Sequence, residues 1–230
     1  MRPTSSHHAF TLPELLVVIT VLSVLTLLFL PAHASGRNKS QRILCINNLK
    51  QLGIAFRLED QGPGSAAERR RQWTDSSHYY QWFLSYSNSL SSPRFLVCPT
   101  DRPQRASPQT WSEFAAPEAR NRAISYFGVT TADETRPQIP LFGDRSFEAQ
   151  PPLPAFSYHS PKAVMGSLTG DSELIRSNVA WTPDAMHRGA GNVALSDGSV
   201  QQLTSARLGA SLTTAGSPAI TLIQPGNAPD

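Results

Sequence analysis

The residues that could do chemistry in this chain are two cysteines, a histidine and a set of carboxylates. Cys45 and Cys98 are too few for a disulfide framework, and neither belongs to a CxxC pair of the kind that binds zinc or works as a redox motif. The other candidates are side chains that could bind a metal ion or transfer a proton. They are Asp144, Asp171, Glu173, Asp184, His187 and Asp197.

These residues do not belong to a known catalytic motif. The sequence has no Gly-x-Ser-x-Gly elbow, no His-Glu-x-x-His and no phosphate-binding glycine loop. A cysteine and a distant histidine occur together too often by chance to indicate nucleophilic catalysis. Asp144 precedes Arg145, and we expect a turn with a local ion pair there. The sequence therefore favours a structural or binding protein over an enzyme.

Asp197 and Gly198 stand between two short runs that read as strands, residues 192–196 and 199–203. An Asp-Gly pair supplies the positive φ angles of a two-residue type I′ turn, so this segment predicts a β-hairpin. In the hairpin Asp197 is a turn residue. His187, which lies ten positions earlier, is expected to be a hydrogen-bond partner at the strand edge.

Glu14 is the one charged residue in a long apolar run, residues 10–30. As a helix this run would span roughly 31 Å at about 1.5 Å per residue, which matches the core of a bilayer. Pro13 is compatible with the helix because the first turn has backbone donors without partners. The sequence leaves two roles for Glu14: it reaches water at the membrane interface, or it neutralises a new α-amino group made by cleavage before Phe10.

The segment from Ala9 through Phe10-Thr-Leu-Pro-Glu14 to Ile19 resembles the cleavage and methylation motif of type IV prepilins and type II secretion pseudopilins. The resemblance implies that a prepilin peptidase cuts after Ala9 and methylates the amine of Phe10. It also implies that Glu14 pairs with the N-terminus of a neighbouring subunit during assembly. Most members of the family have glycine before the cut, and alanine, the next smallest residue, should slow processing rather than prevent it.

The same resemblance implies a place in the cell. A leader peptide, residues 1–9, is followed by a transmembrane helix, residues 10–30, in the bacterial inner membrane, and the soluble domain lies in the periplasm. The expected partners are prepilin peptidase and other pilin or pseudopilin subunits. The expected product is a type IV pilus or a type II secretion pseudopilus.

An ordinary secretory signal peptide is the main alternative for the N-terminus. Residues 1–8 would form its n-region, and Ala32-His33-Ala34 is an A-x-A cleavage site. Cleavage after Ala34 would release a secreted periplasmic binding or scaffold domain. The apolar run is longer than a usual signal-peptide core and contains Glu14, which favours the prepilin interpretation. A third hypothesis is a membrane-tethered sensor or adaptor that keeps its anchor and does not polymerise.

An amphipathic continuation of the helix is predicted over residues 31–59. Cys45, Leu49, Leu52 and Phe56 recur at helical spacing and form an apolar stripe. We expect this stripe to pack on the soluble domain.

A polar loop is predicted over residues 60–78. It contains the run Arg69-Arg70-Arg71, which has no interleaved aromatic residues and is typical of a solvated loop. The formal net charge of +3 is otherwise scattered along the chain, so we expect no nucleic-acid partner.

Residues 60–208 predict a single periplasmic α+β domain. A short helix is expected at residues 79–84, before several strands rich in apolar and aromatic residues. Besides the hairpin, these strands are residues 124–129, 139–143 and 162–168. A helix followed by antiparallel strands gives an α+β fold. The resemblance implies that this fold is pilin-like, with the long N-terminal helix packed on a small antiparallel sheet. The tail, residues 209–230, is expected to be loosely ordered.

His187, Asp197 and Gly198 form an H-x9-DG arrangement. Together with Cys45-Ile-Asn-Asn-Leu-Lys50, it resembles the paired signatures of a subfamily of bacterial pseudopilin-like proteins. The resemblance implies an extracytoplasmic, filament-related protein.

A disulfide between Cys45 and Cys98 is expected from the location. The periplasm permits disulfides, and two cysteines in an exported domain are more often paired than free. Such a bond would stabilise the fold by about 2–4 kcal/mol and would tie the Cys98 loop to the helix.

The resemblance also makes calcium a candidate metal ion. The major secretion pseudopilins of the family bind calcium in a C-terminal loop through carboxylates and backbone carbonyls. Asp171, Glu173 and Asp184 are the weak candidates here, because the sequence has no EF-hand or other dense carboxylate spacing.

Overall fold

A computed structural model describes most of the chain. It covers residues 10–59, 68, 76, 78–101, 105–132, 135–151, 156–157, 162–169, 172–183, 186–214 and 219–226. The chain divides into two compact units, Met1–Ser40 and Gln41–Asp230, which we describe separately. The leader with Ala9, the arginine run 69–71, Asp171 and Asp184 lie outside the described residues.

Helix α1 (Leu12–Glu59) begins after the Thr11-x-x-Glu14 pattern of a capping box, and the Glu14 side chain reaches back to Thr11. The backbone N–H and the hydroxyl of Thr11 both donate to Glu14 Oε2, at 2.8 and 2.6 Å. Pro13 lies in the first turn, where its missing donor costs no hydrogen bond. The end of α1 at Glu59 agrees with the amphipathic helix expected from the sequence.

The first unit exposes apolar side chains on all sides of α1. From Leu12 to Leu27, every leucine, valine and isoleucine is at least 45% exposed. Within the residues that the structure describes, no helix is both long and apolar enough to cross a membrane, so the predicted transmembrane segment 10–30 is not identified as a span.

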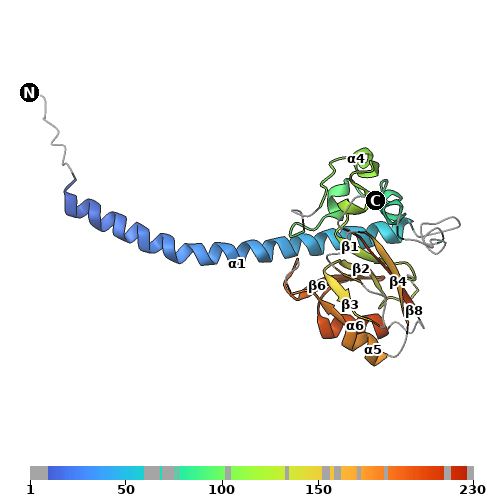
Figure 1. The fold of residues 1–230 in the computed structure, drawn as a ribbon. Helices are drawn as coiled ribbons and strands as arrows, with labels where there is room; N and C mark the ends of the chain where they lie inside the picture. The colour runs from blue at the N-terminus through green and yellow to red at the C-terminus, as the bar shows by residue number, and fades with distance from the viewer. Residues whose placement is uncertain are drawn as a thin grey trace, which may run out of the picture. The chain divides into compact units, whose positions relative to one another are not determined.

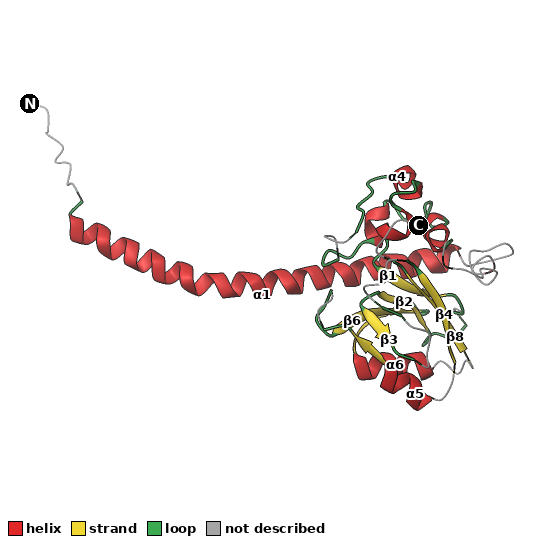
Figure 2. Ribbon diagram, in the orientation of Figure 1, coloured by secondary structure: helices red, strands yellow, loops and turns green. Residues whose placement is uncertain are grey.

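The second unit is built around an antiparallel sheet of six strands in the order β4-β8-β1-β2-β6-β7 (Figures 1 and 2). The strands are β1 (Tyr126–Val129), β2 (Pro140–Asp144), β4 (Val164–Thr169), β6 (Ala190–Leu195), β7 (Val200–Thr204) and β8 (Ala219–Gln224). A separate pair joins β3 (Phe147–Ala149) to β5 (Val179–Trp181). The structure is therefore α+β with an antiparallel sheet, as predicted.

The C-terminal part of α1 buries the predicted apolar stripe. Cys45, Leu49, Leu52 and Phe56 are fully buried, and the Phe56 ring meets Phe142 of β2 edge-on at 6.3 Å. Burial of each such side chain stabilises the fold by about 1.5–3 kcal/mol. The stripe therefore fixes this part of α1 to the second unit.

Short helices complete the core above the sheet. The predicted helix at residues 79–84 is confirmed as α3 (Tyr79–Leu84), which buries Tyr79, Trp82 and Phe83. The other short helices in the described residues between α3 and β1 are η1 (Pro93–Leu96), α4 (Trp111–Ala115) and η3 (Arg120–Ala123).

The C-terminal tail differs from its prediction. Residues 209–230 were expected to be loosely ordered, but they include the end of α6 (Ser205–Thr214) and all of β8, which pairs with both β4 and β1. α6 packs on α5 (Ser172–Asn178) so closely that a Cβ at Gly209 would lie 2.7 Å from the Arg176 Cα. β8, which carries no charged residue, is the part of the tail that lies in the sheet.

The β6–β7 hairpin is confirmed, but its turn is not the predicted type I′. Gly198 N donates to Leu195 O and Leu195 N donates to Ser199 O, both at 2.9 Å. Gly198 has a φ of +85°, whereas Asp197 does not have a positive φ. This pattern is a type I turn followed by a left-handed glycine bulge. A Cβ added at Gly53 of α1 would lie 3.5 Å from Gly198 Cα, so the turn packs directly on the helix.

A buried ion pair lies beside the sheet. Arg145, which follows β2, binds Asp101 through Nε and Nη2 at 2.7 and 2.8 Å, and Arg105 Nε adds a third contact at 3.0 Å. All three side chains are withdrawn from solvent. Burial opposes ionisation of Asp101, but the hydrogen bonds and charges of the two arginines outweigh it and hold the pKa below its ordinary value.

We predict that Asp101→Asn lowers the free energy of unfolding by about 3–5 kcal/mol, because it removes the carboxylate that binds two buried arginines. Urea unfolding of the full chain in detergent, followed by tryptophan fluorescence, measures this change. The matched control is Asp197→Asn at an exposed position, where the asparagine oxygen still accepts from Ser199 N. That variant should leave the free energy of unfolding almost unchanged, and equal losses in both variants would contradict the prediction.

The difference between wild type and Asp101→Asn should depend on pH. A carboxylate whose folded pKa is lowered stabilises the fold fully above its unfolded pKa of about 3.9 and loses this contribution as pH falls through the folded value. The difference should therefore be constant near neutral pH and shrink below about pH 4.

Candidate functional site

Four ionisable side chains from distant parts of the sequence meet in the core of the second unit. Cys45, Cys98, Asp144 and His187 each contribute one potential ligand atom, and these atoms all lie within 4.8 Å of one another. All four residues are buried. We call this set the buried cluster.

The two cysteines are positioned by a helix and a turn. Cys45 belongs to the buried stripe of α1 and so faces the sheet. Cys98 opens a tight turn that is closed by a hydrogen bond from Asp101 N to Cys98 O at 2.9 Å. Pro99 occupies the second position of this turn, where its fixed φ is favourable.

Asp144 is positioned by the sheet. It is the last residue of β2 and lies opposite Tyr126 of β1. The Asn192 backbone N–H and side-chain Nδ2 both donate to Asp144 Oδ2, at 2.7 and 2.9 Å. Since Asn192 lies in the neighbouring strand β6, the carboxylate is oriented by its own sheet.

His187 is positioned by the loop that precedes β6. Arg188 and Gly189, which follow it, both have left-handed φ angles, +54° and +74°. Such a conformation is unfavourable for arginine, and the surrounding contacts must maintain it. One of these contacts is Arg42 of α1, whose Nη2 donates to His187 O at 2.8 Å.

The distances inside the cluster are those of direct polar contacts. Cys45 Sγ donates to Asp144 Oδ1 at 3.0 Å, Cys98 Sγ lies 3.6 Å from His187 Nε2, and this nitrogen lies 3.4 Å from Asp144 Oδ2. Each sulfur also has a hydroxyl neighbour. Tyr126 Oη lies 3.6 Å from Cys45 Sγ, and Thr100 Oγ1 lies 3.0 Å from Cys98 Sγ.

Burial and mutual contacts perturb the acid–base behaviour of all four groups. Burial raises the pKa of Cys45 well above its ordinary value, and it raises the pKa of Asp144. For Cys98, burial opposes ionisation, but contacts with Cys45 and His187 outweigh it and lower the pKa to about 7. Burial also disfavours the charged form of His187, but Cys98 and Asp144 raise the pKa of the imidazole.

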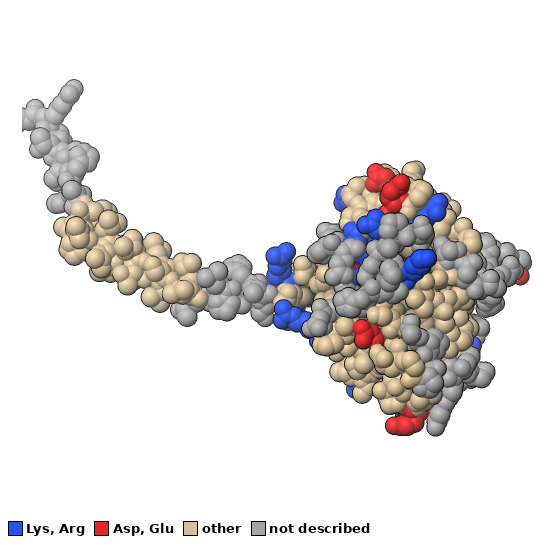
Figure 3. Space-filling view, viewed as in Figure 1, with Lys and Arg blue, Asp and Glu red and all other residues tan. Residues whose placement is uncertain are grey.

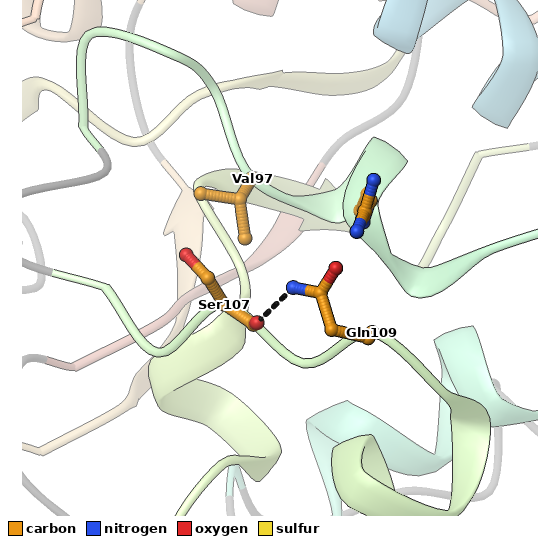
Figure 4. Close-up of a pocket in the computed structure, with 4 residues that line it drawn as sticks. Val97, Ser107 and Gln109 are labelled. Carbon is orange, nitrogen blue, oxygen red and sulfur yellow. Dashed lines mark hydrogen bonds between the residues drawn. The ribbon is translucent and has the colours of Figure 1, made fainter.

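Two surface pockets of the second unit are lined by other residues than those of the cluster. One of about 240 Å³ is lined by Arg94, Val97, Ser107 and Gln109, with a 2.7 Å hydrogen bond from Gln109 Nε2 to Ser107 O (Figure 4). Another, of about 310 Å³, is lined by Arg57, Thr135, Pro137, Ser196 and Asp197. Neither of these two pockets is lined by a cluster residue.

Two of the sequence expectations for these residues need correction. Asp144 does not lie in a turn with a local ion pair: it ends a strand and contacts Cys45, while Arg145 binds Asp101 instead. His187 lies in the buried cluster rather than at a strand edge. Both differences have the same cause, because the sheet brings residues together that are far apart in sequence.

The remaining sequence expectations concern the disulfide, Asp197 and the calcium candidates. Cys45 and Cys98 are free thiols in the structure, and their disulfide stays a prediction. Asp197 is a turn residue, as expected, and accepts a hydrogen bond from Ser199 N at 2.8 Å. Of the three calcium candidates the structure describes Glu173, which is exposed in the first turn of α5.

The sequence analysis missed the residues that support the cluster. Asn192, Tyr126 and Thr100 contact Asp144, Cys45 and Cys98 respectively, and they occur in ordinary strand or turn contexts. A usable signal was the polar Asn192 in an otherwise apolar strand, since a buried amide needs a partner.

We predict that Asn192→Ala lowers the free energy of unfolding by about 1–3 kcal/mol, because it removes a hydrogen-bond donor from the buried Asp144 carboxylate. Asn178→Ala, at the end of α5, is the matched control, since its side chain bonds only to neighbouring groups of the same helix among the contacts described. Its loss should be within about 0.5 kcal/mol. If urea unfolding shows that both variants lose the same free energy of unfolding, the contact between Asn192 and Asp144 contributes no more to stability than the Asn178 contacts do.

The N-terminal segment matches a known family model. Residues 4–30 match the family model of the prokaryotic N-terminal methylation motif. The matched segment contains the junction between Ala9 and Phe10 and also Glu14. Comparisons with curated proteins and with solved structures gave no match. The motif supports a type IV pilin-like protein, and it points to a structural subunit rather than an enzyme.

Proposed function

We propose that this chain is a prepilin or pseudopilin subunit that is cleaved after Ala9, methylated at Phe10 and assembled into a filament. The observation that carries the proposal is the methylation motif over residues 4–30, with Glu14 at the fifth position after the cut. The subunit is anchored in the inner membrane, and its second unit lies in the periplasm. Its partners are prepilin peptidase and other subunits of a type IV pilus or a type II secretion pseudopilus.

The capping box suggests how Glu14 acts before and during assembly. In the single chain its carboxylate accepts two hydrogen bonds from Thr11, so the charge is held at the positive end of the α1 dipole. Cleavage would create a cationic amine at Phe10, four positions before it. The carboxylate of one subunit then attracts the amine of its neighbour and favours one register of the two helices.

The exposed apolar surface of α1 favours association of the subunits. In the first unit this surface is formed by the exposed side chains between Leu12 and Leu27, which Figure 3 shows as a stretch without visible charged side chains. In the second unit α1 exposes Ile43, Leu44, Ile54 and Leu58, each about half exposed or more. Covering such side chains with lipid or with neighbouring helices removes apolar area from water.

The first prediction concerns the mature N-terminus. Mass spectrometry of membrane and soluble fractions should find a membrane-bound chain that begins with N-methylated Phe10. A soluble chain that begins at Ser35 would contradict the proposal and would identify a secreted periplasmic domain. A chain with the methylated terminus that never cross-links to another subunit would instead be a membrane-tethered adaptor.

The second prediction separates the charge of Glu14 from its capping role. Glu14→Gln keeps an acceptor for Thr11 but removes the charge, whereas Glu14→Ala removes both. If charge pairing directs assembly, both variants should be membrane-bound, and both should lose most of their cross-linking to neighbouring subunits. Retained cross-linking in Glu14→Gln alone would show that helix capping, not charge, is what assembly requires. Cysteine cross-linking or immunogold labelling of filaments provides the measurement.

A further inference from the structure

We propose that the buried cluster of Cys45, Cys98, Asp144 and His187 is a zinc site that ties helix α1 to the sheet. This inference is independent of the proposed filament function. It starts from the type of donor: two sulfurs, one imidazole nitrogen and one carboxylate oxygen converge within 4.8 Å. Zinc binds cysteine sulfur, histidine nitrogen and aspartate oxygen, and a structural zinc site has four protein ligands.

The spacing of the donors fits an ion at their centre. Zinc lies about 2.3 Å from sulfur and about 2.0–2.2 Å from nitrogen or oxygen, so a tetrahedral site separates sulfur from nitrogen by about 3.6 Å. Cys98 Sγ lies 3.6 Å from His187 Nε2. Cys45 Sγ and Asp144 Oδ1 are closer, at 3.0 Å, because a thiol proton joins them, and they would separate by a few tenths of an ångström when this proton leaves.

Residues around the cluster are placed to form hydrogen bonds with the proposed zinc ligands. Asn192 holds Asp144 Oδ2 through two donors, which leaves Oδ1, on the side of Cys45, as the ligand atom. The hydroxyls of Tyr126 and Thr100 lie where they can donate to the two thiolates. Such outer contacts orient metal ligands and tune their affinity.

Charge balance also favours a divalent ion. Two thiolates and one carboxylate carry three negative charges, and zinc reduces the total to one. Arg42, which donates to the His187 carbonyl, places a cation next to the site. Binding therefore releases two thiol protons and leaves a modest net charge in the core. Calcium does not fit, because it requires six to eight oxygen ligands.

A disulfide explains fewer of these observations. It would join Cys45 to Cys98 and would remove the thiol contacts of Asp144 and His187, which would keep their own 3.4 Å contact. It therefore accounts for the two cysteines but not for the convergence of the carboxylate and the imidazole on them. A zinc ion engages all four residues at once and connects α1, the Cys98 turn, β2 and the loop before β6.

The test measures metal binding by the full chain. The protein is purified in detergent without a polyhistidine tag, reduced under anaerobic conditions and dialysed against zinc. Mass-spectrometric elemental analysis should find zinc equimolar with protein. Replacement of zinc by cobalt should give the intense visible and near-ultraviolet bands of tetrahedral cobalt bound to thiolates, which requires no variant and so does not depend on a mutant folding.

Variants then assign the ligands. Cys98→Ser and His187→Asn should weaken zinc binding by more than about 100-fold, while Thr100→Val, which removes an outer contact, should weaken it by about 10–100-fold. His78→Asn, at an exposed histidine outside the cluster, is the matched control and should bind zinc as the wild type does.

Two outcomes would overturn the proposal. One is a reduced and folded chain that retains neither zinc nor cobalt. The other is equal metal binding by wild type and by both ligand variants, which would place the metal elsewhere. If the reduced chain binds no metal and the isolated chain has lost two hydrogens by intact mass, the cysteines form the predicted disulfide instead.

Discussion

A carboxylate removed from water needs a partner, and two such carboxylates determine how the second unit is built. Asp144 and Arg145 are consecutive residues at the end of β2, and Cys98 and Asp101 open and close one turn. Asp144 meets Cys98 in the buried cluster, while Arg145 binds Asp101. The strand and the turn are thus connected twice, so a shift of either one would break polar contacts of buried charged groups.

Helix α1 combines two different physical environments in one element. Its N-terminal part exposes apolar side chains on every side, whereas its C-terminal part buries only the stripe through Cys45 and Phe56. The second part is attached to the domain by apolar packing, by Arg42 at the His187 carbonyl and by Arg57 at the Asp197 carbonyl. One continuous helix therefore carries both the surface suited to association and the contacts that hold the domain.

Periodic patterns made much of this fold predictable. The stripe of α1, the short helix α3 and the β6–β7 hairpin follow from local spacing and turn residues, and the structure confirms them. Local spacing and turn residues did not predict the type of the hairpin turn, nor that the C-terminal tail forms a helix end and a strand. These two features depend on α1 packing against Gly198 and on β8 finding a place in the sheet.

The candidate site was predictable only in its parts. Cys45, Cys98, Asp144 and His187 were each recognised as chemically capable, but their sequence separations reach far beyond any local motif. What unites them is the register of β2 with β6, which sets Asp144 beside Asn192, and the bend after His187. Pairing between strands that are far apart in the sequence produces no periodic pattern from which it could be predicted.

The position of β8 has a consequence for the order in which the chain can fold. This strand follows all the other described strands in the sequence, yet it lies between β4 and β1. Until it emerges, β1 lacks a partner on one side, β4 has no place in the sheet, and both present unpaired backbone groups. The sheet is therefore completed only when residues 219–224 are available, and removal of β8 would leave β1 with one open edge and β4 without its partner in the sheet.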